Sequence, residues 1–335
     1  MTPPTGHPAI PPARVGVLIV NLGTPDAAEA GAVRRYLAEF LSDPRVVEIP
    51  RLIWKPILHG VILRTRPRKS AHAYSLVWRE DGSPLAAITR NQAQALRSRF
   101  GDAVMVEHAM RYGRPAIADR LAAMKAAGCE RILIAPLYPQ YCAATTATAN
   151  DAAFAALAAM RWQPAIRTLP PYYDDPAYID ALKTSVEASL AALPFAPDAI
   201  LASFHGMPAR TLELGDPYHC HCRKTARLLA DALGRDLIVS FQSRFGRAKW
   251  LEPATDVTLA GLPAKGAKRV AVIAPGFSAD CLETLEELAI RGRETFLAAG
   301  GTDFAYLPCL DDDRPGIEML HHLLQRELAG WVSSS

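Results

Sequence analysis

Three side chains in the second half of the sequence have the chemistry to accept protons and to bind a hard metal ion. His205 comes directly after the apolar run Ala199–Phe204, and Gly206 turns the chain away behind it. Glu283 and Glu287 are four residues apart, so a helix places both carboxylates on one face. Neighbouring carboxylates repel, which raises the proton affinity of one of them, and an unperturbed imidazole has a pKa of about 6.5. These residue types predict a site for proton transfer or metal handling.

Each of these features also has a purely structural interpretation. A histidine at a strand end can be held by a hydrogen bond to a loop carbonyl and do no chemistry. Asp280 and Glu283 have the spacing of a capping box, in which the side chains bond backbone amides at the start of a helix. Early acidic residues also suit the helix dipole. The local pattern leaves both interpretations open.

Polar and aromatic residues gather at or just beyond the ends of several predicted strands. They are Asn21, Arg111, Tyr112, Tyr138, Gln140 and Trp250. Together they would line a cleft with aromatic faces, one Arg and little net charge, which suits a flat conjugated ligand. No G-x-G-x-x-G or Walker-type loop follows these strands, so the sequence does not indicate a nucleotide site. The formal net charge of +3 gives no reason to expect nucleic acid as a partner.

Such residues need a fold that brings strand ends together, and the rest of the chain predicts one. Short apolar runs alternate with longer helical patterns, which indicates parallel sheets with helical crossovers. The predicted strands are Val15–Asn21, Ala103–Ala109, Arg131–Leu137, Ala165–Leu169, Ala199–Phe204, Asp236–Phe241, Lys268–Ala274 and Asp303–Pro308. The predicted helices include Ala27–Leu41, Ala177–Leu193, Cys281–Ala299 and Pro315–Trp331. We predict an α/β protein of two similar Rossmann-like lobes, each a four-stranded parallel sheet flanked by helices, with a ligand cleft between them.

The same pattern predicts the boundaries of these units. Residues 1–14 are rich in proline, contain no apolar run and are predicted to form a flexible tail. Residues 15–170 form the predicted first lobe, and residues 171–313 form the second, which carries the candidate metal site. Residues 314–331 form a last helix that is expected to pack back on the first lobe. No segment reaches the roughly 18 apolar residues of a membrane span, and the cysteines are irregularly spaced, so we expect a cytoplasmic protein with reduced thiols.

One segment departs from the regular alternation of strands and helices. Arg51–Lys69, here called the lip, mixes bulky apolar residues with six Lys and Arg side chains. Such a segment could form an exposed edge that binds a greasy, acidic ligand or rests peripherally on anionic lipid. An ordinary helix that covers its own lobe has a similar composition, because long basic side chains often lie along apolar surface. Both interpretations stay open.

Several short motifs, which occur in order along nearly the whole chain, resemble those of ferrochelatases. The motifs are Asn21-Leu22-Gly23-Thr24-Pro25, Gly82-Ser83-Pro84-Leu85, Arg111-Tyr112, Tyr138-Pro139-Gln140-Tyr141, Ser203-Phe204-His205-Gly206-Met207-Pro208, Gly215-Asp216-Pro217-Tyr218, Gln242-Ser243, Trp250-Leu251-Glu252-Pro253 and Pro275–Leu288. The resemblance implies a lyase that inserts Fe²⁺ into protoporphyrin IX and releases two protons, the last step of haem biosynthesis. It also implies two Rossmann-like lobes with the porphyrin between them.

Carried over by position, the resemblance assigns roles to the candidate residues. It implies that His205 and Glu283 bind the metal and accept protons, and that Glu287 continues the acidic face. Phe277 and Trp250 match positions that wall the macrocycle, and Arg79 is implied to meet a propionate. The other porphyrin-lining candidates are Asn21, Arg111, Tyr112, Tyr138 and Gln140. Fe²⁺ and protoporphyrin IX are the implied substrates, and the sequence does not identify an iron donor.

Related functions remain as alternatives. The substrate could be coproporphyrin III, the metal could be cobalt, or the same lobes could form a non-catalytic haem carrier. Coproporphyrin-type relatives usually have Tyr-Gly-Thr-Pro where this chain has Asn21–Pro25, and the apolar lip suits the vinyl groups of protoporphyrin. A carrier needs a strong axial ligand and no proton acceptors, so the carboxylate pair near His205 argues against it.

The cysteines mark a departure from the family pattern. Cys281 stands where many relatives have a second histidine beside the key glutamate. Cys142, Cys220 and Cys222 lie in segments that we expect to be neighbours, and they could hold a 2Fe–2S cluster with a fourth ligand that the sequence does not identify. Because four thiolates are normally needed, three reduced cysteines are the favoured interpretation.

Overall fold

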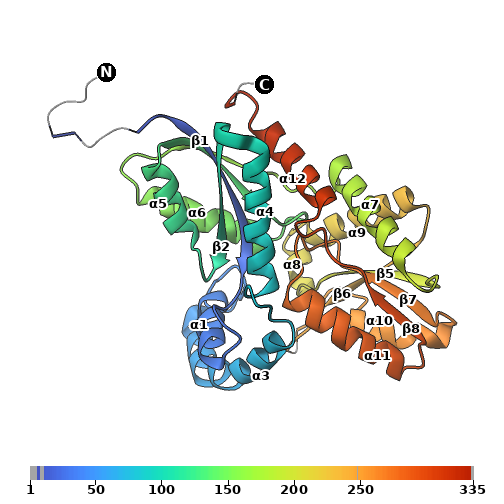
Figure 1. Cartoon of the computed structure of the whole chain (residues 1–335). Helices are drawn as coiled ribbons and strands as arrows, with labels where there is room; N and C mark the ends of the chain where they lie inside the picture. Colours follow the sequence, from blue (N-terminus) through green and yellow to red (C-terminus); the bar gives the residue numbers. More distant parts are fainter. Residues whose placement is uncertain (1–5, 8–10, 247, 333–335) are drawn as a thin grey trace.

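The computed structural model describes residues 6–7, 11–246 and 248–332, and the chain forms two parallel sheets (Figure 1). The strand orders are β2-β1-β3-β4 and β6-β5-β7-β8, and every pair of neighbours is parallel. The strands are β1 Arg14–Gly23, β2 Val104–Tyr112, β3 Cys129–Pro136, β4 Ala165–Thr168, β5 Ala199–His205, β6 Leu237–Gln242, β7 Arg269–Ile273 and β8 Asp303–Tyr306. The predicted α/β fold of two similar four-stranded lobes is confirmed.

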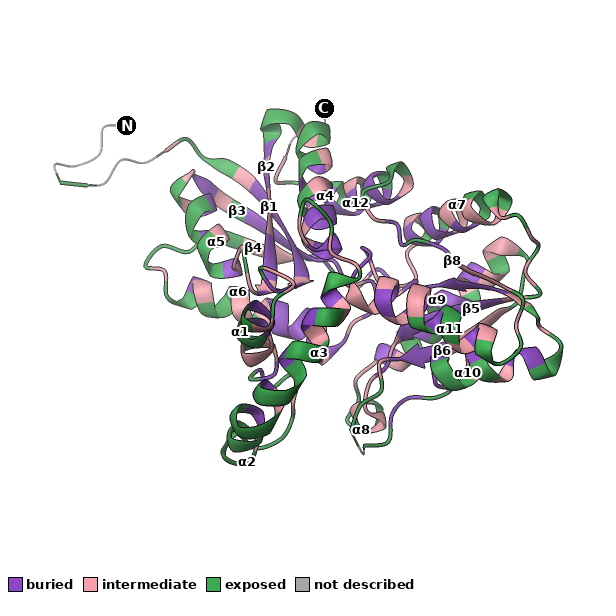
Figure 2. Cartoon of the chain, turned by 60° about the horizontal axis from the view of Figure 1, so that its bottom comes forward, coloured by how far each residue is buried: buried purple, intermediate pink, exposed green. Residues whose placement is uncertain are grey.

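The strands are apolar in nearly every position because helices cover both faces of each sheet. Residues 17–20 of β1 have no exposed surface, and neither do Leu201, Ala202 and Phe204 of β5. Strands buried on both faces have no alternation of polar and apolar residues. Figure 2 shows the buried strands in purple between helices whose outer faces are green.

Twelve α-helices connect and cover the strands of the described chain. They are α1 Ala30–Phe40, α2 Arg51–Ile57, α3 Leu63–Ser75, α4 Pro84–Phe100, α5 Ile117–Ala126, α6 Thr148–Ala158, α7 Pro176–Ala192, α8 Ala209–Glu213, α9 Tyr218–Leu233, α10 Thr255–Gly261, α11 Arg293–Ala298 and α12 Arg314–Glu327. Most predicted elements agree with these to within a few residues. β2 extends past its predicted end at Ala109, so Arg111 and Tyr112 lie inside the strand.

The two lobes share one continuous apolar core. Val17 and Leu133 of the first lobe belong to the same buried cluster as Phe204 and Phe241 of the second. Helix α12 lies at this junction, where it packs against α7 and against α4 of the first lobe (Figure 1). The shared core makes the relative placement of the two sheets a packed contact and not a flexible linkage.

The helix that carries the acidic residues differs from the one predicted. In place of a single helix over Cys281–Ala299, the chain forms the π-helix η5, Glu283–Gly292, followed by α11. The predicted capping box is absent, because the Asp280 carboxylate accepts hydrogen bonds from Thr284 Oγ1 and Tyr306 and does not cap the helix. π-Helical turns occur mostly as short segments at functional sites.

The lip is exposed along α2, but Leu58 and Leu63 further along it pack with Leu41 in a buried cluster of the first lobe. None of the residues of α2 is buried, and the side chains of Leu52 and Ile53 are 92% and 59% exposed. The next residues form the π-helix η1, Leu58–Ile62, where only Leu58 is buried, and then α3. The exposed residues of α2 fit the first of the two interpretations of this segment, and the buried Leu58 and Leu63 fit the second.

The ends of the chain add little to this picture. β1 begins at Arg14, and most of the predicted tail over residues 1–14 lies outside the described residues. No helix of the described chain has the length and apolar character needed to cross a membrane.

Gly23 at the end of β1 has no room for a side chain. Its φ is +108°, and an added Cβ would lie 1.8 Å from the Tyr112 carbonyl oxygen of the neighbouring strand. We expect Gly23→Ala to lower the free energy of unfolding by at least about 2 kcal/mol, because it adds backbone strain to a clash that only a backbone shift can relieve. Chemical denaturation monitored by circular dichroism measures this change.

Gly31 provides the matched control, because it lies in α1 and an added Cβ would meet nothing within 4 Å. Gly31→Ala is expected to raise the free energy of unfolding by about 0.5–1 kcal/mol through higher helix propensity. Equal stability of the two variants would contradict the packing described for Gly23.

Candidate active site

His205 is the last residue of β5 and is held in one orientation by its own loop. Its Nδ1 is 2.7 Å from the carbonyl oxygen of Gly206. A carbonyl oxygen can only accept, so Nδ1 carries the proton of the neutral ring and Nε2 keeps a free lone pair. The ring is half-buried and its centroid is 6.5 Å from that of Phe277. The hydrogen bond that holds the ring uses Nδ1 only, so a structural role for this histidine is compatible with the use of Nε2 as a base.

The side chain of Gln242 ties the end of β5 to the start of η5. Gln242 is the register partner of His205 on β6. Its Oε1 accepts from Ser203 Oγ at 2.8 Å, and its Nε2 donates to the backbone oxygen of Glu283 at 2.7 Å. The residue is 2% exposed, so both ends of the amide need these partners. Gln242 thus places Glu283 at the strand end that carries His205.

The charge of Glu283 acts on titratable groups of the first lobe. Burial, together with the negative charge of Glu283, raises the pKa of Tyr74 on α3 and of the Cys281 thiol. Burial and the neighbouring Tyr74 and Glu283 likewise raise the pKa of Tyr36 on α1. Leu282, one residue earlier, packs against the apolar cluster that contains Tyr74. The start of η5 therefore reaches across from the second lobe into the first.

Glu287, by contrast, has both carboxylate oxygens engaged. Oε1 accepts from the backbone nitrogen of Ser243 at 2.8 Å, and Oε2 accepts from Ser243 Oγ at 2.5 Å. Arg291 lies 3.8 Å from Oε2. These contacts hold Ser243 in the left-handed region, with φ at +64°. Glu287 is a fixed carboxylate on the wall of a hollow of about 320 Å³, which Gln242 also lines.

Aromatic side chains pack against the loop that follows His205. An added Cβ on Gly206 would lie 2.4 Å from the Gln242 carbonyl oxygen and 3.3 Å from the Trp250 ring, so the loop after His205 packs closely under Trp250. The Trp250 ring is 4.8 Å from that of Phe245, measured between centroids. The guanidinium of Arg66 in α3 lies 5.3 Å from the Phe245 ring centroid. The lip of the first lobe and the loop 243–250 of the second therefore meet.

Asp43, which carries no functional signal in the sequence, organises the first lobe's side of the site. Its Oδ2 accepts from Arg111 Nη2 at 2.5 Å, from the Tyr112 hydroxyl at 2.8 Å and from Thr148 Oγ1 at 2.5 Å. Burial alone would raise the pKa of Asp43, but the hydrogen bonds from Thr148, from the Arg45 backbone and from Tyr112, with the charge of Arg111, lower it overall.

The other predicted porphyrin-lining residues fall into two groups. Asn21, Tyr112 and Gln140 are 4%, 0% and 2% exposed, and their polar atoms bond within the protein. Gln140 donates to Thr225 of α9 and so joins the two lobes. Tyr138 differs, because its buried hydroxyl has no hydrogen-bond partner among the described residues. Arg79 is exposed and pairs with Asp81.

A comparison with known proteins identifies the family. The model of the family named Ferrochelatase matches residues 14–328. The chain belongs to the ferrochelatase family. It is similar to the ferrochelatase of Rhizobium meliloti (strain 1021), with 56% identity that covers 98% of this chain and 99% of the relative. It is also similar to the ferrochelatase of Azoarcus sp. (strain BH72), with 53% identity that covers 96% of this chain and 90% of the relative.

Solved structures share the fold of this ferrochelatase-family chain. SirB from Bacillus subtilis with Fe³⁺ matches with a TM-score of 0.58 and 12% identity, covering 95% of this chain and 97% of the other. CbiX, described as the terminal enzyme for siroheme biosynthesis in denitrifying bacteria, matches with a TM-score of 0.52 and 16% identity, covering 94% of this chain and 100% of the other. At these identities the likeness concerns the fold alone.

The three cysteines considered for an iron–sulfur cluster do not fit one as they are placed. Cys220 and Cys222 lie two residues apart on α9, so they point to opposite sides of the helix. Cys142 and Cys222 are 1% and 0% exposed, whereas Cys220 is on the surface. Among the residues that the structure describes, no three His, Cys, Asp or Glu side chains are grouped to hold a metal ion.

The network around Asp43 has a measurable effect on stability. We expect Asp43→Asn to lower the free energy of unfolding by about 3 kcal/mol at neutral pH, because it leaves Arg111, whose side chain is only 18% exposed, without its counter-charge. The folded-state pKa of Asp43 is lowered, so its contribution is present above the unfolded pKa of about 3.9 and is lost as the pH falls further. The stability difference between wild type and variant should therefore shrink below about pH 4, as measured by urea denaturation across pH. A difference that is the same at pH 3 and pH 7 would contradict the lowered pKa.

Proposed function

We propose that this protein inserts Fe²⁺ into protoporphyrin IX, as a lyase that catalyses the last step of haem biosynthesis. The reaction removes two protons from the pyrrole nitrogens as the metal enters. The observation that carries the proposal is a half-buried histidine with a free Nε2 at the strand end to which Gln242 ties the backbone of Glu283, in a chain of the ferrochelatase family. The match covers 99% of the ferrochelatase of Rhizobium meliloti (strain 1021), which supports the same activity.

His205 is the proposed acceptor of pyrrole protons. Its Nδ1 hydrogen bond to Gly206 leaves Nε2 as the atom that accepts. The same bond stabilises the ring after protonation, because the carbonyl remains an acceptor for the Nδ1 proton. One nitrogen ligand with one carboxylate is a loose set for a divalent metal, which suits a site that must release iron into the porphyrin.

Glu283 and Glu287 have different proposed roles. The charge of Glu283 acts on Tyr36, Tyr74 and Cys281, and Glu283 is the carboxylate proposed to bind Fe²⁺ with His205 or to accept a proton. Glu287 is already held by Ser243, so it keeps its negative charge in a fixed place. We propose that it attracts the cation or draws protons along the helix, and does not itself bind the metal at the porphyrin.

The porphyrin is proposed to lie between the lobes. Phe277 and Trp250 form aromatic walls near His205, and the unpartnered hydroxyl of Tyr138 is available for a polar group of the ligand. Arg79, whose ion pair with Asp81 is exposed, is free to exchange that partner for a propionate. Four other candidates are proposed to shape the wall of the site from inside the protein, because their polar atoms are already hydrogen-bonded within the fold. They are Asn21, Arg111, Tyr112 and Gln140.

Removal of the imidazole tests the proposed base. His205→Ala is expected to bind protoporphyrin IX nearly as wild type does but to metallate it about 10²–10⁴-fold more slowly, because a positioned base is lost. Anaerobic loss of porphyrin fluorescence on addition of Fe²⁺ measures the rate, and quenching of tryptophan fluorescence measures binding. Added imidazole should restore part of the rate, which a merely misfolded variant would not show.

His322→Ala is the matched control, because His322 is exposed on α12. Metallation by His205→Ala at near the wild-type rate would remove the assignment. The same assay with coproporphyrin III, and with Co²⁺ in place of Fe²⁺, separates the alternative chelatases. A wild-type protein that binds haem but gives no turnover would be a carrier.

We also propose that the lip rests on anionic lipid. Leu52, Ile53, Ile57 and Val61 are 92%, 59%, 40% and 55% exposed, and basic side chains lie on either side of them in the sequence. Apolar side chains that enter the interface and cations that meet acidic headgroups both contribute to such binding. The contact would place the lip, and the cleft behind it, at a source of a sparingly soluble porphyrin.

Negative charge introduced at the exposed residues Leu52 and Ile53 of the lip tests the proposed contact with lipid. The double variant Leu52→Glu/Ile53→Glu is expected to lose at least about tenfold in affinity for phosphatidylserine-containing vesicles, because each buried aliphatic side chain contributes about 1.5–3 kcal/mol. Vesicle sedimentation measures the affinity. Val257→Glu, an exposed apolar position on α10 of the second lobe, should bind vesicles as wild type does. Equal binding by the lip variant would disprove the contact.

A further inference from the structure

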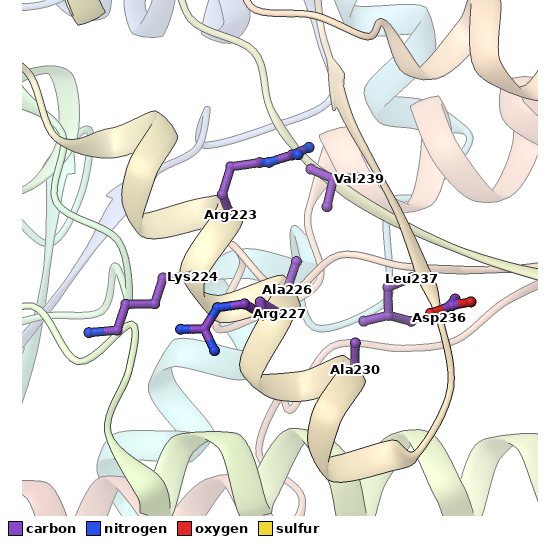
Figure 3. Close-up of a pocket in the computed structure, with 8 residues that line it drawn as sticks. All are labelled: Arg223, Lys224, Ala226, Arg227, Ala230, Asp236, Leu237 and Val239. Atoms are coloured by element: carbon purple, nitrogen blue, oxygen red, sulfur yellow. The ribbon is translucent and has the colours of Figure 1, made fainter.

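A second hollow lies on the outer side of the second lobe, between α9 and the free edge of its sheet (Figure 3). Its volume is about 560 Å³. The small side chains of Ala226 and Ala230 leave space between the helix and the strand β6, and Leu237 and Val239 line it from the strand. None of the residues of the candidate active site lines this hollow.

The edge strand β6 offers unpaired peptide groups to this hollow. β6 is the outermost strand, with β5 on its other side. Gln242 carbonyl oxygen accepts from Gly206 on the β5 side, whereas the Phe241 nitrogen donates to Pro253 on the outer side. Alternate residues of a strand point their peptide groups the same way, so those of Leu237 and Val239 also point outward. In the described chain no backbone or side-chain hydrogen bond occupies that outer side at either residue.

The charged side chains that line the hollow are mostly basic. Arg223, Lys224 and Arg227 come from α9, and Asp236 is the one acid. Arg223 forms no ion pair with any described residue, and Figure 3 shows it extended toward Val239. Arg227 pairs with Asp231 through side chains that are 62% and 69% exposed, a contact too weak to hold it against a competing acid.

We propose that this hollow binds an extended acidic segment of a partner protein, which adds to the sheet as a strand beside β6. The backbone of the segment would pair with Leu237 and Val239, and its alternate side chains would point toward α9. Acidic residues at these alternate positions meet Arg223 and Arg227. This hollow is separate from the candidate active site, and it gives the protein a docking surface for the partner.

Charge argues against a second copy of this chain as the occupant. Two copies paired edge to edge through β6 would bring α9 of each near the other, so that Arg223 and Arg227 face their own counterparts. Like charges placed together at an interface cost free energy and select against that partner. An acidic strand has no such penalty.

A labelled peptide tests the proposal. A short fluorescein-labelled peptide of alternating Glu and Thr should bind the full-length wild-type protein, as measured by fluorescence anisotropy, while its Lys-for-Glu twin should not. Arg223→Glu should weaken binding at least tenfold. Val239→Pro should do the same, because proline removes an outward peptide N–H that the sheet does not use and is tolerated on an edge strand.

Two controls keep the result specific. Arg161→Glu reverses an exposed charge in the first lobe and should leave peptide binding unchanged. All three variants should metallate porphyrin at the wild-type rate, which shows that they are folded and keeps this test separate from that of the proposed reaction. Binding of the Lys peptide as tightly as the Glu peptide would overturn the proposal. So would wild-type binding by Arg223→Glu or by Val239→Pro, or a dimer in ultracentrifugation that Val239→Pro dissociates.

Discussion

The side-chain amide of Gln242 joins the end of one strand to the start of the helix that carries the acidic residues. Its oxygen accepts from Ser203 and its nitrogen donates to the Glu283 backbone, in a setting that is 2% exposed. Loss of either hydrogen-bond partner of this buried amide would lower the stability by about 1–3 kcal/mol, so the two bonds together hold the Gln242 side chain in place. The rest of the site depends on this amide, because it ties the backbone at the start of η5 to the strand next to His205.

The second constraint is that the site is assembled from both lobes. Leu282 comes from the second lobe but packs against the apolar cluster of the first lobe that contains Tyr74, and the charge of Glu283 helps raise the pKa of Tyr36 and of Tyr74. The shared apolar core and α12 make this arrangement rigid, since the lobes cannot separate without exposing buried surface. Opposed walls that belong to one packed body suit a flat ligand whose shape must be held or distorted during metal entry.

Charge is distributed unevenly over this site. Glu287 is neutralised in part by Ser243 and Arg291, and Asp43 by Arg111, so both are fixed carboxylates with structural partners. Glu283 has a buried thiol and two tyrosines as its neighbours, which offer no positive charge. Among the residues that the structure describes, Glu283 has no ion-pair partner, whereas Glu287 and Asp43 each have one. Carboxylates that look alike in the sequence therefore have different surroundings in the folded protein.

The sequence by itself determined the fold class, the strands and the position of His205 at a strand end, because runs of apolar residues record burial on both faces of a sheet. It also carried the family resemblance in short motifs. Only the tertiary structure decided that η5 is a π-helix, that Cys220 and Cys222 diverge, and that Tyr112 is tied to Asp43. Asp43 and Arg111 are 68 residues apart, so their pairing depends on which strands become neighbours. Local patterns encode burial and direction, whereas hydrogen bonds between distant side chains exist only once the whole chain has packed.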